Sequence, residues 1–257
     1  MELYFSAFWQ SVYSLPKDWE KLVNMSEMSI CQTFCRAETR MKKNLEKQKE
    51  FKNYLLDSGA FSIMMNPKSS QKFEIMDYTE KYAKFIKENN IEDFIELDID
   101  SIYGIQIYKD CLHKLQDITG KNPIKVFHMW RGKDYFLELV KKEKRIAISR
   151  IASAGNSNKL KESDFILIND LIQIAHDNNC KVHGLGITGS AELRKYNFDS
   201  IDSSSWNSGV RSGSFCRFDG HSINVYKNPG DYKLDGKIYA LNGFLEWKKY
   251  SDYLLKL

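Results

Sequence analysis

Three aspartates each follow a short apolar run, and the three runs lie far apart in the sequence. They are Asp57, Asp98 and Asp202. Two close carboxylates suit glycosidic chemistry, because one can attack the anomeric carbon while the other moves a proton on the leaving or incoming group. A third carboxylate can accept hydrogen bonds from the N–H groups of a heterocycle. If the fold brings the three side chains together, they are suited to breaking a glycosidic bond.

Each aspartate also has a purely structural interpretation. An aspartate just past a strand often caps the next helix, since its carboxylate accepts hydrogen bonds from free backbone N–H groups. This explanation serves any one of the three better than it serves all three at equivalent strand ends. Their spacing alone does not identify a reaction.

Other polar and small residues lie at the ends of apolar runs or in the loops that follow them. A barrel enzyme presents its reactive groups from such places, at the C-terminal ends of its strands. The loop after Asp202 is rich in serine and carries an arginine nine positions on. The further candidates for substrate contact are Ser58, Gly59, His128, Ser149, Arg150, Gly184, Gly186 and Arg211.

The elements that would position these residues alternate between strands and helices. Apolar periodicity predicts helices over 77–90, 106–118, 134–142, 162–178 and 243–257. It also favours an exposed helix over the charged segment 36–52 and a last strand over 238–241. The strands are predicted over 2–9, 28–34, 54–56, 94–97, 124–127, 145–148, 181–186 and 198–201.

This alternation indicates a parallel sheet, and a strand count near eight favours a closed (β/α)8 TIM barrel. The chain of 257 residues has the length of one such barrel, so residues 1–257 are predicted to form a single domain. A doubly wound open sheet is the alternative. It is disfavoured because no GxGxxG phosphate loop follows an early strand.

Composition limits which cell compartment and which partners are expected. The longest apolar run falls short of 18 residues, so no membrane-spanning helix is expected. The N-terminus lacks the basic region of a signal peptide. Five scattered cysteines fit reduced thiols in a cytoplasmic protein better than a disulfide framework. A net charge of +4 permits a nucleic-acid partner without demanding one.

Several short motifs resemble the tRNA-guanine transglycosylase superfamily. DSGAF at 57–61 resembles its DSGG motif, and FIELDID at 94–100 resembles the strand whose aspartate contacts a guanine-like base. KVFHMW at 125–130, GLGIT at 184–188 and IDSSSWNSGVRSG at 201–213 follow in the family's order. The resemblance covers about residues 54–213 and is strongest to the compact phage-type enzymes that exchange guanine for 7-deazaguanines in DNA.

The resemblance implies a role for each matching residue. Asp202 would be the nucleophile that attacks C1′, and Asp57 the general acid/base. Ser58 would contact the base or ribose, and Asp98 would bind the purine-like edge. Arg211 would contact phosphate or fix the Asp202 loop. No cofactor is implied, and the partners would be DNA and a free 7-deazaguanine base.

Two departures from the family pattern bear on the substrate. The tRNA enzymes carry a zinc subdomain with three cysteines and a histidine, whereas only Cys216, with His221 nearby, follows the nucleophile segment here. Four-ligand zinc cannot be built from these residues, so no metal is expected and tRNA is the less favoured substrate. Ser149-Arg150 also replaces the family's base-binding Gly-Gly, which leaves the identity of the base open.

Three hypotheses follow. The first is a DNA guanine transglycosylase that works by double displacement. The second is an N-glycosidase or nucleoside hydrolase on the same scaffold, with water as the acceptor. The third is a nucleotide or nucleic-acid binding protein without turnover. Tyr103, Trp130 and Trp206 are candidates for stacking on bases, whereas His176 and His183 are interpreted as structural.

Overall fold

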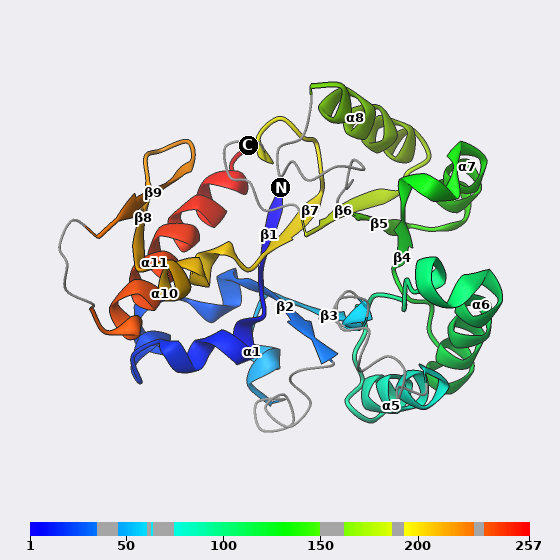
Figure 1. The fold of residues 1–257 in the computed structure, drawn as a ribbon, viewed down its shortest axis with the longest axis horizontal. Helices are drawn as coiled ribbons and strands as arrows, with labels where there is room; N and C mark the ends of the chain where they lie inside the picture. The colour runs from blue at the N-terminus through cyan, green and yellow to red at the C-terminus, as the bar shows by residue number, and fades with distance from the viewer. Residues whose placement is uncertain (35–45, 61–62, 64–74, 150–161, 187–192, 229–233) are drawn as a thin grey trace.

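The structure is a computed structural model of the 257-residue chain. It describes all residues except 35–45, 61–62, 64–74, 150–161, 187–192 and 229–233 (Figure 1).

A curled sheet of seven parallel strands forms the centre of the molecule (Figure 1). The strand order is β3-β2-β1-β7-β6-β5-β4. The predicted parallel α/β architecture is thus confirmed, and seven of the predicted strands are present. Their bounds are β1 Glu2–Ser6, β2 Ser29–Thr33, β3 Asn53–Asp57, β4 Lys125–Phe127, β5 Arg145–Ser149, β6 Lys181–Leu185 and β7 Ser200–Ser203.

The strand predicted over 94–97 is present only as two isolated bridges. Phe94 pairs with Leu56 of β3, and Ile95 pairs with Ile124 beside β4. The ladder of backbone hydrogen bonds stops there. The next parallel bond would run from Val126 N to the Glu96 carbonyl, but Val126 N donates instead to the side-chain Oε1 of Glu96, at 2.9 Å. The sheet is therefore a half-barrel of seven strands, and not the closed eight-stranded barrel that the sequence predicted.

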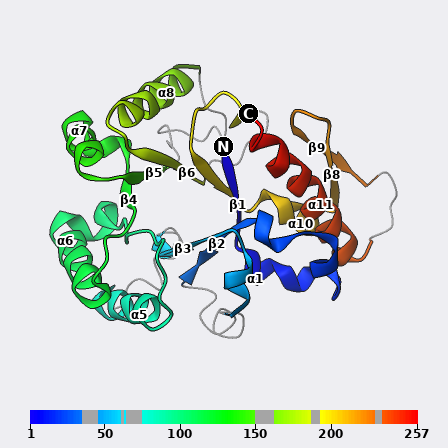
Figure 2. The same ribbon diagram turned by 180° about the vertical axis from the view of Figure 1, so that it is seen from behind.

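Helices surround the outside of the curled sheet (Figure 2). Those predicted over 77–90, 106–118, 134–142 and 162–178 are confirmed as α5 Ile75–Glu88, α6 Asp100–Thr119, α7 Lys133–Lys142 and α8 Glu162–Asp177. Tyr78, Tyr82, Phe85 and Ile86 of α5 are buried, as their spacing predicts. The described residues also form the α-helices α1 Phe8–Ser11, α10 Ser208–Ser212 and α11 Gly236–Leu254.

The C-terminal part of the chain differs most from the prediction. Residues 238–241 belong to α11 and not to a strand, because Asp235 starts the helix early by accepting a hydrogen bond from Lys237 N at 2.9 Å. An unpredicted antiparallel hairpin, β8 Ser214–Phe218 and β9 Ile223–Lys227, precedes it. Of the helix predicted over 36–52, the described residues contain only the 3-10 helix η4 Glu46–Glu50.

The N-terminus lies against the end of α11, where Met1 N donates to the Leu254 carbonyl at 3.1 Å (Figure 1).

Two separate apolar clusters hold the sheet. The larger one packs the helices against the outer face. The smaller one, here called the inner cluster, lies on the concave face and consists of Tyr4, Cys31, Leu55, Ile95, Ile124, Val126 and Ala147. Each strand thus has one face toward the helices and one toward the inside of the curl, as in barrel sheets.

Candidate active site

Polar side chains gather on the concave face just beyond the inner cluster. Side chains two residues apart on a strand share a face. Five members of the inner cluster are followed, two residues later, by Ser6, Thr33, Asp57, His128 and Ser149. Because the strands are parallel, these residues meet at the carboxyl-terminal end of the sheet.

Asp202 lies within β7, and donors from neighbouring strands hold its carboxylate. Ser6 Oγ donates to Oδ2 at 2.5 Å, and Gly186 N donates to Oδ1 at 2.8 Å. His183 Nε2 lies 3.5 Å from Oδ1. Burial by itself raises the pKa of Asp202, but His183, Ser6 and Gly186 together outweigh it and hold the pKa below its usual value. Asp202 is therefore ionised at neutral pH.

Asp57, the last residue of β3, has the opposite electrostatic character. Burial raises its pKa to about 7, and the negative charges of Asp98 and Asp202 add to the rise, against a hydrogen bond from Thr33. Thr33 Oγ1 donates to Asp57 Oδ2 at 3.0 Å. The fold thus brings the three aspartates close enough to interact electrostatically. At neutral pH, Asp57 is divided between its acid and its carboxylate.

Asp98 follows the two bridges and contacts the loop after β4. His128 Nε2 lies 2.8 Å from Asp98 Oδ2, and both side chains are buried. The His128 ring stacks on Trp130, with ring centroids 4.1 Å apart and an interplanar angle of 12°. Trp130 is 61% exposed. Asp98 therefore contacts the ring edge of His128, and His128 in turn stacks on Trp130, which is open to solvent.

A buried arginine braces the segment on both sides of Asp98. Arg131 binds Asp100 with two bonds, Nε to Oδ2 at 3.0 Å and Nη2 to Oδ1 at 2.8 Å. Its Nη1 lies 3.3 Å from Oε1 of Glu96, whose Oε2 accepts a 2.8 Å bond from the Tyr108 hydroxyl. Burial raises the pKa of Glu96, and Arg131 opposes that rise. This network ties the Asp98 segment to the loop that carries His128.

Ser58 and Gly59 shape the turn after Asp57. Ser58 is fully buried, and its Oγ accepts from Ala60 N at 3.3 Å while its carbonyl accepts from the Tyr78 hydroxyl at 2.5 Å. Gly59 has a φ of 79°, which a residue with a side chain rarely adopts. Ser58 thus stabilises the turn after Asp57, while the Gly59 N–H helps to lower the pKa of Asp57.

The two glycines of the GLGIT motif have different functions. A Cβ on Gly184 would lie 3.1 Å from Ile201 Cγ2 and from the Phe198 ring, so this position serves close packing between β6 and β7. Gly186 has a φ of 69° and donates its N–H to Asp202. Gly186 is therefore part of the site, whereas Gly184 supports it.

The other predicted residues are less closely associated with the aspartates. Ser149 ends β5 on the concave face, and Arg211 is exposed on α10. Arg150 lies outside the described residues. Trp206 is fully buried, and its indole N–H donates to the Ser6 carbonyl at 3.0 Å, so it is not available to stack on a base. Tyr103 is partly buried against the larger core.

Ser6, Thr33 and His183 contact the aspartates but were not among the residues predicted to form the site. Ser6 and Thr33 end strands and carry no motif, so only the register of the sheet identifies them. His183 stands beside Gly184 in the GLGIT strand, but its apolar neighbours favoured a structural interpretation. The alternation of polar and apolar residues in β6 is the signal that could have placed it on the concave face.

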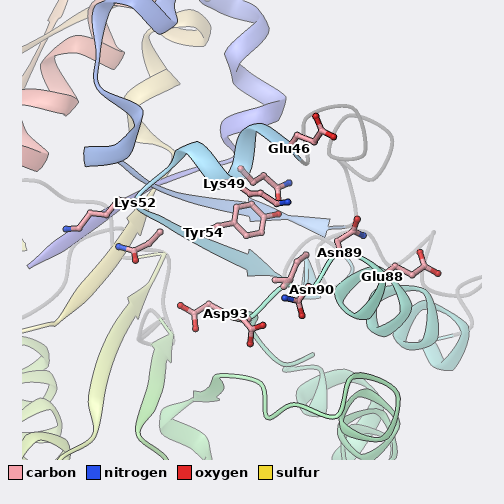
Figure 3. A pocket seen from close by; sticks show the side chains of 12 residues that line it. Glu46, Lys49, Lys52, Tyr54, Glu88, Asn89, Asn90 and Asp93 are labelled. Atoms are coloured by element: carbon pink, nitrogen blue, oxygen red, sulfur yellow. The ribbon is translucent and has the colours of Figure 1, made fainter.

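A pocket of about 670 Å³ lies away from these residues, at the beginning of β3 (Figure 3). Its lining runs from Glu46 to Tyr54 and from Glu88 to Asp93, with gaps in the first range. None of the three aspartates lines it. Because it lies at the amino-terminal end of β3, it is separate from the candidate site.

Two absences characterise the part of the chain that the structure describes. No group of three or more His, Cys, Asp or Glu side chains in that part of the chain is arranged to hold a metal ion. No helix found there combines the length and apolar character needed to cross a membrane. The four cysteines that the structure describes, Cys31, Cys111, Cys180 and Cys216, are buried and free.

No family model matches the chain, and no curated protein matches it.

Proposed function

We propose that this protein is a transglycosylase that exchanges guanine in DNA for a 7-deazaguanine base through a covalent intermediate on Asp202. The proposal rests on two interacting carboxylates whose pKa values are shifted in opposite directions. The pKa of Asp57 is raised to about 7, while that of Asp202 is lowered. Titratable groups whose environments separate their pKa values in this way are typical acid/base and nucleophile pairs.

In the first half-reaction, an oxygen of the Asp202 carboxylate attacks C1′ of the nucleotide. The C1′–N9 bond breaks, and its electron pair passes to the departing guanine. Protonated Asp57 gives its proton to that base, so guanine leaves neutral and Asp57 becomes a carboxylate. Both carboxyl groups start in the required state near neutral pH.

In the second half-reaction, the charges return to their starting positions. The incoming 7-deazaguanine loses its N9 proton to the Asp57 carboxylate and attacks C1′. The C1′–oxygen bond to Asp202 breaks and restores the carboxylate. A group with a pKa of about 7 suits both directions of this proton transfer, because its two forms are similarly populated.

Asp98 is assigned the recognition of the base. A carboxylate can accept two hydrogen bonds from the adjacent N–H and amine of a guanine-like edge. His128 binds Oδ2 and fixes the orientation of the carboxylate, so that Oδ1 is presented to the base. The stacked and exposed Trp130 supplies an aromatic surface for a nucleotide next to the site.

The proposal includes the scaffold and the partner. We infer that residues 1–257 form one domain with a TIM-like half-barrel, in which the segment 94–97 lies between β3 and β4 and is joined to that part of the sheet by two bridges. DNA is preferred over tRNA because the chain has too few cysteines and histidines after Asp202 for the zinc subdomain of the tRNA enzymes. A cytoplasmic enzyme is proposed from its free cysteines.

The test is base exchange into defined polymers. Purified protein is incubated with radiolabelled guanine or a labelled 7-deazaguanine and, separately, with duplex DNA, single-stranded DNA and tRNA. Label in DNA supports the proposal, and label in tRNA alone overturns the choice of polymer. Release of free guanine without incorporation would indicate an N-glycosidase, in which water takes the place of the incoming base. Binding of base or DNA with neither reaction would indicate a protein without turnover.

A further inference from the structure

His183 is a buried histidine whose second nitrogen faces the proposed nucleophile. The side chain is fully buried on the concave face of β6. Its Nδ1 lies 2.9 Å from Ser200 Oγ. Within the described part of the chain, its Nε2 has no hydrogen bond and lies 3.5 Å from Asp202 Oδ1. A buried polar atom without a partner calls for an explanation, because it has lost its water without a replacement.

The hydrogen-bonding groups around His183 favour one of its two neutral tautomers. Arg145 Nη2 donates to Ser200 Oγ at 3.2 Å, and a guanidinium can only donate. The serine oxygen can accept from Arg145 and still donate its own hydrogen to Nδ1, and the nearby Asp202 carboxylate favours the tautomer in which it does so. The proton of a neutral His183 is then on Nε2, directed at Asp202. The other tautomer would set a nitrogen lone pair against a carboxylate oxygen.

The surroundings keep this histidine uncharged. The charged and titratable groups that face it are Asp202 on β7, Arg145 on β5, Tyr4 on β1, and Asp93, which precedes the segment 94–97. Burial lowers the pKa of His183, and the nearby Arg145 lowers it further, against the attraction of Asp202. A neutral donor can steady a carboxylate without taking over its negative charge as an imidazolium would.

We propose that His183 is a positioning residue that orients the Asp202 carboxylate through a neutral Nε2–H donor, in a tautomer that the carboxylate favours and the Ser200 hydroxyl completes by donating to Nδ1. This inference rests on the proposed function for its catalytic part. Nε2 lies 3.5 Å from Asp202 Oδ1, and catalytic hydrogen bonds often tighten when substrate binds. Together with Ser6 and Gly186, His183 places the carboxylate for attack on C1′.

The first arm of the test needs no activity. The full chain is labelled with ¹⁵N-histidine, and the His183 signals are assigned by their loss in His183→Gln. At about pH 7 to 8, Nε2 is expected to carry the proton and Nδ1 to have the shift of an unprotonated nitrogen. A proton on Nδ1, or a charged His183 in that range, would overturn the proposal even if the protein proves not to be a transglycosylase.

The second arm uses exchange activity. His183→Leu removes the donor, and kcat is expected to fall roughly 10- to 100-fold, as for one hydrogen bond to a charged group, without a change in KM for the base. The acid limb of the pH profile should move to higher pH. His183→Gln, whose amide nitrogen can replace Nε2, should restore most of kcat. Equal losses in the two variants would contradict a positioning role.

His176→Gln is the matched control for this arm. His176 on α8 also binds an aspartate, with Nε2 2.9 Å from Asp199 Oδ2, but it lies away from the concave face. Its replacement should leave kcat and the pH profile unchanged. If His183→Leu does not fold, the nitrogen shifts of the first arm still decide the proposal, because they are measured on the wild-type protein.

Discussion

The hydroxyl of Ser6 lies 2.5 Å from Oδ2 of Asp202, so the last residue of β1 holds a carboxylate that is 196 residues further along the chain. Ser6 is itself fixed, because its carbonyl accepts the indole N–H of the buried Trp206. The position of the proposed nucleophile thus depends on the packing of the first and seventh strands.

Replacing Ser6 by alanine should slow the reaction without changing the fold. The loss of a donor to Asp202 raises the pKa of that carboxyl group and loosens its orientation. We expect kcat to fall roughly tenfold, the effect of one hydrogen bond to a charged group, and the acid limb of the pH profile to move upward. Ser222→Ala is the control, since Ser222 donates to Asp219 on the exposed turn between β8 and β9. An unchanged acid limb in Ser6→Ala would rule out this role.

Asp202→Asn should abolish base exchange while leaving the protein folded. An amide cannot form the glycosyl–enzyme bond. Radiolabelled DNA should therefore give a band that survives denaturation with the wild type and no such band with the variant. The control is Asp252→Asn, which changes an aspartate of α11 paired with Lys248. Full activity in Asp202→Asn would exclude the mechanism.

Asp57 should make stability depend on pH. Its pKa is about 7 in the folded protein against the 3.8 that is ordinary for an aspartate, so between these pH values the unfolded chain loses a proton that the folded protein keeps. Stability contributed by this group is present below about pH 4 and is lost as the pH rises toward 7. The shift corresponds to at most about 4 kcal/mol.

Asp57→Asn should remove this loss and yield a protein that is inactive but more stable at pH 7 than the wild type. Urea unfolding at about pH 4 and pH 8 would measure it, with the difference between variant and wild type growing at the higher pH. A variant that is equally less stable at both pH values would show that the Asp57 carboxylate is not strained by its surroundings.

Arg131→Met should destabilise the protein strongly. It would leave the buried Glu96 without its cation and free Asp100, and breaking a buried pair from one side usually costs about 3–5 kcal/mol. Lys142→Met is the control, because its pair with Glu138 is mostly exposed and contributes little. A drop below about 1 kcal/mol in urea unfolding for Arg131→Met would show that the network does not brace the Asp98 segment.

Apolar runs were sufficient to predict seven of the strands and most long helices, because a buried parallel strand and an amphipathic helix each have a local pattern. The three aspartates could be placed at the same end of the sheet for the same reason. The partners of those aspartates could not be predicted, since Ser6 and Thr33 reach them only through strand register. The β8–β9 hairpin and the early start of α11 were missed because turn and capping residues decide both.

The Glu96 side chain gives the region between β3 and β4 an unusual property. In an ordinary ladder, pairing is specified by backbone groups that every residue except proline possesses. Here the carboxylate of Glu96 accepts the hydrogen bond of Val126 N. The pairing of the segment 94–97 with β4 therefore depends on the identity of a single side chain. Exchange of the Val126 amide proton with solvent would measure how stable this hydrogen bond is. Relatives without an acceptor at position 96 would have to pair these two segments through other groups.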